Sequence, residues 1–225
     1  MKHKRTAIVV RQHRRFLYLV VAVSLVLGVI GPTQLLPVQR VQALGSVTVD
    51  GAVSSGTDHD VSTISVSHTT GTGTNRLMLV AVSANNYTTA FNIDSVSFTY
   101  DSTELELTEV GTQTDSGRKT AIYRLLDPPS GQSGTVTVDF SATIGYSIVV
   151  GVANFEGVDQ TTPLGTFAGT AGNWSGASPS LEVSGLDGDE LVFDSVYGGG
   201  SSSPTLVVGD GQTELWNVQG DQRID

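Results

Sequence analysis

One pair of carboxylates in the chain has a spacing that could support catalysis. The segment NFEGVDQTTPLG, residues 154–165, places Glu156 and Asp159 three positions apart, directly after an apolar run. Two carboxyl groups that face one substrate bond, roughly 5 to 9.5 Å apart, form the active site of many glycoside hydrolases. The flanking residues favour another use, because Gly157 permits an unusual backbone angle and the Asp, Thr and Pro residues after it are typical of turns. We therefore expect a turn that closes a strand.

Histidine and nucleophile chemistry have little support. His3 and His13 lie in the basic N-terminal segment, which leaves His59 and His68 as the remaining imidazoles. His68 falls on the apolar face of an alternating run, so we expect a hydrogen-bonded residue at the edge of the core; a zinc site usually needs several protein ligands. The sequence contains no cysteine, which excludes thiolate zinc sites and cysteine nucleophiles. A G-x-S-x-G nucleophile motif is also missing, and we assign no catalytic, cofactor-binding or metal-binding residue.

Two short acidic segments could contribute to a calcium site. The sequences DHD at Asp58–Asp60 and DGDE at Asp187–Glu190 cluster carboxylates, and calcium prefers several oxygen ligands from loops. Neither segment has the twelve-residue spacing of an EF-hand loop. We expect solvated turns at both places.

Two aromatic residues lie in polar surroundings and could bind sugar rings. Trp174 occurs in GNWSGAS and Tyr87 in ANNYTTAF, so either could be an exposed platform. The alternative is that each covers an end of the fold, because aromatic side chains bury large areas when they can. Isolated exposed apolar residues are common, and the sequence leaves both interpretations open.

The elements that would position these residues are short strands. From residue 46 onward, apolar residues recur at every second position between clusters of Gly, Ser, Asp, Asn and Pro, which is typical of half-buried strands. The alternating runs are VTV (47–49), ISVSH (64–68), VSFTY (96–100), LEL (105–107), AIYRL (121–125), VTVDF (136–140), LEV (181–183) and LVFDSVY (191–197). A further strand-like stretch, TELWNV, occupies residues 213–218.

Two segments are apolar on both faces. RLMLVAVSA at residues 76–84 and SIVVGVANF at residues 147–155 break the alternation. A strand buried on both faces is usually central in its sheet or covered by another layer, so we predict that these are the middle strands. Short connections rich in turn residues, with very little helix, favour an all-β fold: an antiparallel β-sandwich with jelly-roll or Greek-key (Ig-like) wiring.

The first 43 residues have the pattern of an export signal. Basic residues precede the uncharged run FLYLVVAVSLVLGVI at residues 16–30, and small residues follow, with a plausible cleavage point after Ala43. Retention as a membrane anchor helix is the alternative, because charges are absent from Phe16 through Gln39. We favour cleavage, since Gly31 and Pro32 interrupt the apolar run. In either case the positive flank stays inside and the rest of the chain is exported.

The remainder, residues 44–225, is strongly acidic and is expected to form a single domain. It holds five Lys and Arg residues against twenty-two Asp and Glu residues, so no basic stripe is present to bind nucleic acid or an anionic lipid surface. A domain of about 180 residues can bury roughly 70% of its unfolded surface. Disulfides are therefore unnecessary for its stability.

Several phrases together resemble a known type of module. They are SVSHTTGTGTNRLMLVAVS, YRLLDPPSGQSGTVTVDFS, ANFEGVDQTTPLG and DGDELVFDSV, and they look like a GVDQTTP-containing β-sandwich module of secreted and surface-attached bacterial proteins. The likeness covers roughly residues 46–218. It implies a structural or adhesive unit with no catalytic residues. Modules of this kind continue through a glycine-rich loop into further strands, so we expect the chain to be truncated after Asp225.

The sequence thus predicts an exported, non-enzymatic β-sandwich module with a structural or adhesive role at the cell surface or outside the cell. Its expected partners are glycans or other surface proteins, and it would touch a membrane only through an uncleaved N-terminal segment. No cofactor is expected. The first alternative is a carbohydrate-binding module that uses Trp174 or Tyr87. A weaker alternative is a hydrolase of the jelly-roll type.

Overall fold

The structure is a computed structural model that describes residues 2–10, 46–173, 180–186, 190–199 and 206–220. Within these residues the chain is all-β and contains no helix, which confirms the predicted fold class at this level. The strands are β1 (Lys2–Val10), β2 (Thr48–Val49), β3 (Ser54–Asp58), β4 (Val61–Thr69), β5 (Leu77–Asn85), β6 (Ile93–Tyr100), β7 (Thr103–Glu106), β8 (Thr108–Asp115), β9 (Arg118–Leu126), β10 (Ser133–Ile144), β11 (Ser147–Glu156), β12 (Ala168–Asn173) and β13 (Leu191–Gly199).

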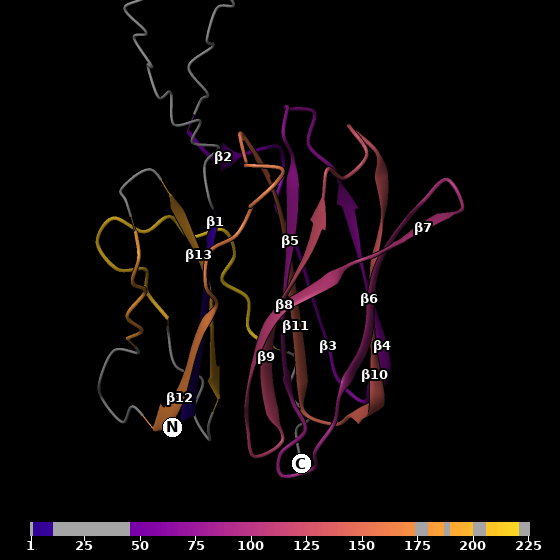
Figure 1. Cartoon of the computed structure of the whole chain (residues 1–225). Coiled ribbons are helices and arrows are strands. Elements are labelled where there is room, and N and C mark those ends of the chain that lie inside the picture. Colours follow the sequence, from indigo (N-terminus) through magenta and orange to yellow (C-terminus); the bar gives the residue numbers. More distant parts are fainter. Residues whose placement is uncertain (1, 11–45, 174–179, 187–189, 200–205, 221–225) are drawn as a thin grey trace, which may run out of the picture.

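Two antiparallel sheets face each other and form a β-sandwich-like body (Figure 1). The smaller sheet has the strand order β4-β10-β6-β7, and the larger has the order β2-β11-β5-β9-β8, with β3 also paired to β11. Alternate side chains of both sheets fill the space between them, as expected where sheets stack face to face. The buried residues of this inner core include Ile64, Val80, Val82, Phe98, Val136, Val138, Ile148 and Val150.

The larger sheet is buried on both of its faces at β5 and β11. Every residue of β5 except the last is buried. Neighbouring side chains of a strand point to opposite faces, so Met78 and Val80 enter the inner core while Leu77 and Leu79 enter a second core on the outer face. The structure therefore confirms that the two doubly apolar segments are central strands, and it supplies the further layer that covers them.

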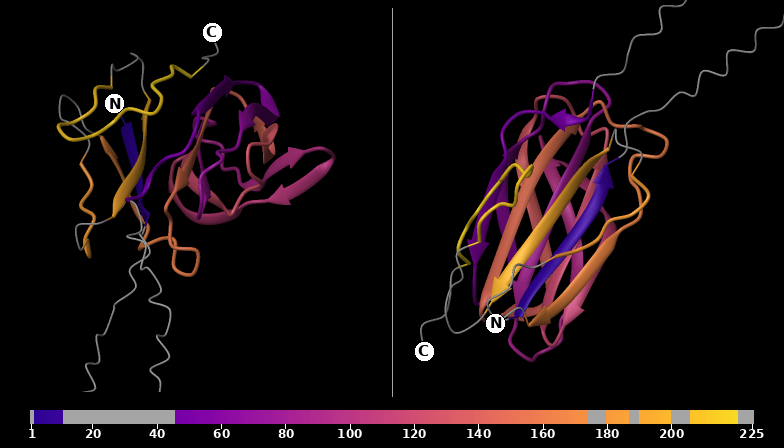
Figure 2. Two further views of the ribbon diagram at one scale, coloured as in Figure 1. Left: turned by 90° about the horizontal axis from the view of Figure 1, so that it is seen from above. Right: turned by 90° about the vertical axis from the view of Figure 1, so that its left-hand side faces the viewer.

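That further layer is a sheet of three strands with the order β12-β1-β13. In the right-hand view of Figure 2 these strands run across the front of the larger sheet. Ile8 of β1 is fully buried, and Phe193 of β13 meets the ring of Phe155 at a centroid distance of 5.8 Å. Leu215 and Trp216, in the segment after β13, also pack against this outer core. The central sheet is thus covered on both sides.

The basic segment expected as the flank of an export signal is strand β1. Lys2–Val10 pairs antiparallel with both β12 and β13. The apolar run at residues 16–30, predicted as a signal or anchor helix, lies outside the described residues. In the part of the chain that the structure describes, no helix has the length and hydropathy needed to span a bilayer.

Several local expectations need correction. The runs LEV (181–183) and TELWNV (213–218) are not strands, because the backbone there has no ladder partner. The run AIYRL in β9 is not half-buried: Ala121 and Tyr123 face the inner core, whereas Ile122 enters the outer core. Alternation within one strand does not reveal a third layer. The sequence also gave no strand signal for β3, β8 or β12, which are rich in Gly, Ser and Thr.

Replacement of Leu79 by Ala tests the cover on the outer face. Leu79 is fully buried, and a Leu→Ala change at such a site costs about 2–5 kcal/mol of unfolding free energy. Leu126→Ala is the matched control, because Leu126 is 36% exposed and its loss should change stability much less. Urea unfolding followed by circular dichroism measures both. Equal costs for the two variants would show that the outer face is open to water.

Candidate functional site

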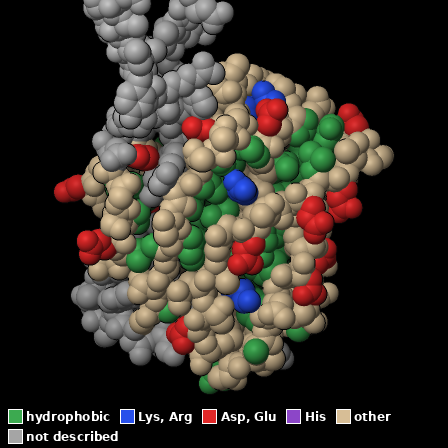
Figure 3. Space-filling model, viewed as in Figure 1, with side chains coloured by type: hydrophobic (Ala, Val, Ile, Leu, Met, Phe, Trp, Pro, Cys, Tyr) green, Lys and Arg blue, Asp and Glu red, His purple; other side chains and the backbone are tan. Residues whose placement is uncertain are grey.

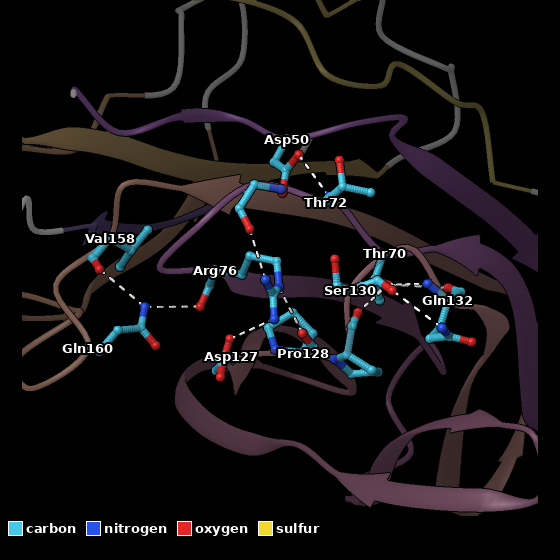
Figure 4. Close-up of polar contacts among 12 residues, drawn as sticks. Asp50, Thr70, Thr72, Arg76, Asp127, Pro128, Ser130, Gln132, Val158 and Gln160 are labelled. Atoms are coloured by element: carbon cyan, nitrogen blue, oxygen red, sulfur yellow. Dashed lines mark hydrogen bonds and ion pairs between the residues drawn. The ribbon is translucent and has the colours of Figure 1, made fainter. Parts of the chain in front are cut away.

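Three loops meet at one end of the sandwich (Figure 4). They carry parts of the sequence phrases that resemble the secreted bacterial modules. They are residues 70–76 before β5, residues 127–132 after β9 and residues 157–165 after β11. The first loop receives two backbone hydrogen bonds of 3.0 Å from each of the others, donated by Asp127 and Gly131 of the second loop and by Gly157 and Val158 of the third. Segments far apart in the sequence thus form one polar cluster, which we call the signature-loop cluster.

Arg76 lies at the centre of the signature-loop cluster. Its Nη1 donates to the carbonyl of Gly73 at 2.8 Å, and its Nε donates to the carbonyl of Pro128 at 2.9 Å. Its Nη2 forms an ion pair of 2.8 Å with Asp127. A guanidinium has five donors in a fixed plane, so this one side chain satisfies carbonyls that no neighbouring strand can reach. Its role is to hold two loops together.

Asp50 contributes a second set of contacts from the segment after β2. Its carboxylate accepts hydrogen bonds from the backbone amides of Thr72 at 3.2 Å and Gly73 at 3.0 Å. The carboxylate lies so close to Gly71 that any side chain at that position would collide with it. The close approach of the buried Asp50 carboxylate therefore explains Gly71, and close approach of the Glu156 side chain explains Gly73.

Thr70 ties the same loop to the Asp-Pro-Pro turn. Its hydroxyl donates to the carbonyl of Pro129 and accepts from the amide of Gln132 at 2.8 Å. The Thr70 amide in turn donates to the Gln132 carbonyl at 2.9 Å. The two prolines of this turn have no backbone N–H to donate. The Thr70 hydroxyl and amide therefore supply donors for the carbonyls of Pro129 and Gln132. The polar side chains here stabilise the loops.

The paired carboxylates of the GVDQ turn have separate roles. Asp159 is 8% exposed, and one of its oxygens accepts from the amides of Thr161 at 2.7 Å and Thr162 at 3.0 Å. This is the turn contact that the sequence predicted. Glu156, the last residue of β11, accepts from the Thr48 hydroxyl at 3.3 Å. Gly157 between them has a φ of +74°, a conformation that glycine adopts at little cost.

His68 is a buried, hydrogen-bonded residue at the edge of the inner core, as predicted. Its Nε2 accepts from Asn154 Nδ2 at 2.7 Å, and that amide also donates to the Thr69 carbonyl. The neutral ring then carries its proton on Nδ1, which lies 2.9 Å from the Ser54 hydroxyl. Burial lowers the pKa of His68 below its usual value of 6.5. The ring thus links β4, β11 and β3.

The calcium candidates differ in what the structure describes. In the first, the Asp58 carboxylate accepts from the backbone amide of His59 at 2.8 Å, and His59 Nε2 lies 4.0 Å from Asp60. In the second, residues 187–189 lie outside the described residues. Within the part of the chain that the structure describes, no three or more His, Asp or Glu side chains form a group that could hold a metal ion.

An aromatic pair lies at the end of the sandwich opposite the signature-loop cluster. Tyr87 follows the far end of β5, is 55% exposed and stacks on Tyr146 with centroids 5.5 Å apart and an interplanar angle of 26°. Asn85 accepts from the Tyr87 amide at 3.0 Å, and Asn86 accepts from the Gly145 amide at 3.0 Å. These bonds fix both tyrosine loops. The other sugar-platform candidate, Trp174, lies outside the described residues.

Sequence reasoning found Tyr87 but missed its partner Tyr146, because the contact joins two turns that are far apart in the chain. It also missed Arg76 and Asp50, whose partners are mainly backbone groups. A scan against protein-family models and searches of curated proteins and of solved structures give no match for this chain. The resemblance to secreted bacterial modules therefore rests on the sequence phrases alone.

Asp159→Ala tests the structural role of the GVDQ turn. The change removes two hydrogen bonds to a buried carboxylate and should lower the unfolding free energy by about 1–2 kcal/mol. Asp94→Ala at an exposed position is the control, with an expected change within about 0.5 kcal/mol. Urea unfolding measures both variants. The turn role is wrong if Asp159→Ala leaves stability unchanged.

His68 gives the stability of the fold a pH dependence. Because the folded chain lowers the pKa of His68 below 6.5, the unfolded chain binds a proton before the folded chain does as the pH falls. The free energy of unfolding should therefore decrease as the pH drops below about 6.5. His68→Gln should be less stable at pH 7.5 but show a shallower decline between pH 7.5 and 5.5. Urea unfolding across this range decides, and identical slopes for the two proteins would contradict the assignment.

Proposed function

We propose that the chain is an exported, non-enzymatic β-sandwich module with a structural or adhesive role at the cell surface or outside the cell. The observation that carries this proposal is the use of its polar residues. In the signature-loop cluster, Arg76 and Asp50 are engaged with the backbone of neighbouring loops, and Asp159 with the backbone of its own turn. Side chains that satisfy loop backbone in this way stabilise exposed turns, and such turns suit a module that must persist outside the cell.

The surface chemistry supports the same proposal. Figure 3 shows the face of the molecule that is turned to the viewer in Figure 1. Asp and Glu side chains are spread over this face, with few Lys and Arg side chains among them. An acidic surface of this kind repels nucleic acid and anionic membranes. The partners that fit it are neutral glycans or other surface proteins. No cofactor enters the proposed role.

We also propose that the two sheets are connected by jelly-roll or Greek-key wiring. The chain passes from β4 in the smaller sheet to β5 in the larger and back to β6, and it crosses again between β7 and β8, between β9 and β10, and between β10 and β11. Repeated crossing between two sheets supports jelly-roll or Greek-key wiring.

Export can be tested by measuring the molecular mass of the chain recovered outside the cytoplasm, because that mass identifies its N-terminus. With full-length protein expressed in a bacterial host, we expect the chain recovered outside the cytoplasm to begin at Leu44, because signal peptidase would cut after Ala43. The control is an Ala43→Arg variant, which places a large charged residue at the cleavage point and should retain its leader. Recovery of the chain only in the cytoplasm, with Met1 or Lys2 at its N-terminus, would refute export.

The Tyr87–Tyr146 pair favours a second candidate, a carbohydrate-binding role. Two stacked rings on fixed loops, one of them 55% exposed, offer a flat apolar surface of the kind that sugar rings pack against. A glycan array with the full chain tests this: Tyr87→Ala should lose any binding that the unaltered chain shows, and Thr88→Ala, an exposed neighbour, should keep it. If the unaltered chain binds no glycan, this candidate is rejected.

A further inference from the structure

Tyr87 has a backbone conformation that bulky residues rarely adopt. Its φ is +59°, in the left-handed region where the Cβ of an L-residue crowds the following carbonyl oxygen. The residue is also 55% exposed, so burial of the ring does little to offset this cost. Strained residues that the surrounding structure holds in place are concentrated at ligand sites. The conformation of Tyr87 therefore points to a use beyond folding.

Four turns meet at the tyrosine end of the sandwich and hold the Tyr87 loop. The amide of Asn86 donates to the carbonyl of Gly117 in the β8–β9 turn at 2.8 Å. The Asn86 side chain accepts from the amide of Gly145 in the β10–β11 turn at 3.0 Å. The amide of Asp60 in the β3–β4 turn donates to the Ile144 carbonyl at 2.7 Å. The ring of Tyr87 thus stands on a fixed base.

Tyr146 covers one face of the Tyr87 ring and leaves the other open. The two rings stack with centroids 5.5 Å apart. Tyr87 keeps more than half of its surface, whereas Tyr146 is only partly exposed. The neighbouring residues 88–90 are Thr, Thr and Ala, and all three are exposed. The end of the sandwich therefore presents one flat aromatic face in polar surroundings.

Hydrogen-bonding groups lie beside the stacked rings. Gly145 directly precedes Tyr146, and a Cβ on Gly145 would stand 3.6 Å from an oxygen of the Asp60 carboxylate and 3.6 Å from the side-chain oxygen of Asn86. The side chain of Asp60 is 50% exposed. An ionised carboxylate has two oxygens and accepts several hydrogen bonds. Asp60 can therefore receive two neighbouring hydroxyl groups of a ligand at this end.

Size and charge restrict the class of that ligand. A stable protein interface buries roughly 800 Å² per partner around an apolar centre, whereas an aromatic side chain offers roughly 150–250 Å². Charged residues of both signs lie in the turns and strand ends around the rings: Asp60, Asp115, Arg118 and Lys119. This mixture favours neither an anion nor a cation. A small neutral ring that carries hydroxyl groups fits, because it offers a flat apolar face and several hydrogen-bond donors.

We propose that the open face of Tyr87 binds a single neutral pyranose unit of a glycan, with Asp60 accepting hydrogen bonds from its hydroxyl groups. One aromatic face holds one sugar ring, so further sugar units add no contact with the platform. This site deepens the second candidate function, and it rests on that candidate. The leading proposal, an exported structural or adhesive module, does not depend on it.

Titration of the full chain with sugars of increasing length tests the size of the site. The probes are the methyl pyranosides of glucose, galactose, mannose and N-acetylglucosamine, each with a matching disaccharide and tetrasaccharide. Binding is followed by ligand-detected NMR and by calorimetry. We expect at least one methyl pyranoside to bind with an affinity within about fivefold of that of its tetrasaccharide, because only one sugar unit contacts the ring.

Tyr87→Asn removes the platform and leaves the fold intact. Asn adopts the left-handed conformation more readily than Tyr, so the melting temperature should stay within about 4 °C of that of the unaltered chain. Sugar binding should fall at least about tenfold.

Asp60→Asn tests the polar partner. Asp60 has a φ of +55°, which Asn tolerates, and a neutral amide is a weaker acceptor than a carboxylate. Binding should therefore weaken about three- to tenfold. Asp101→Asn is the matched control. Asp101 is also exposed and has a φ of +43°, but it lies in the β6–β7 turn at the other end of the sandwich, so this variant should bind like the unaltered chain.

Two kinds of outcome would overturn the site, and they are distinguishable. If the unaltered chain binds none of the probes, the site and the carbohydrate candidate are rejected together. If a probe binds equally well to the Tyr87→Asn variant, or if affinity rises more than about fivefold from pyranoside to tetrasaccharide, the one-unit site is wrong and the carbohydrate candidate stands. Neither outcome affects the test of export, which is read from the N-terminus of the recovered chain.

Discussion

Burial of the central sheet on both faces is the constraint on which the structure depends. Strands β5, β9 and β11 send apolar side chains to both sides, so one covering sheet cannot remove them all from water. Exposure of a buried Leu or Phe side chain costs about 1.5–3 kcal/mol, and a whole domain is stable by only about 5–15 kcal/mol. Exposure of only a few side chains, such as Leu77, Leu79 and Phe155, would therefore cancel most of the free energy of unfolding. The sequence of the central strands therefore requires a cover on the outer face as well as on the inner one.

The two ends of the sandwich differ in how their loops are held. At the signature-loop cluster, Arg76, Asp50 and Thr70 bond mainly to the backbone of neighbouring loops. At the opposite end, two tyrosines stack above turns fixed by asparagine side chains. In the first arrangement the polar side chains are hydrogen-bonded to the backbone of the loops. In the second, the ring of Tyr87 remains exposed and available for contact. If the module binds a sugar, the tyrosine end is the place that fits.

Much of the sandwich could be predicted from the sequence, and the exceptions have physical reasons. Doubly apolar runs identified β5 and β11, and local turn chemistry identified the role of Asp159, because both signals lie within one short segment. The third layer was missed since its middle strand has the composition of a leader. The run TELWNV contributes Leu215 and Trp216 to the outer core without pairing as a strand, so an apolar pattern of this kind does not by itself establish backbone pairing. Arg76 escaped prediction because two of its three partners are backbone carbonyls, which residue types do not reveal.

The most direct test of the double cover uses the absence of cysteine in the chain. Single-cysteine variants Ala81→Cys on the outer face, Ala121→Cys on the inner face and Ala52→Cys at an exposed position are treated with a thiol reagent under native conditions. The account predicts rapid labelling of the Ala52→Cys variant, with labelling of the other two limited by unfolding. Labelling of the Ala81→Cys variant as fast as that of Ala52→Cys would show that the outer face is bare, and would contradict the account.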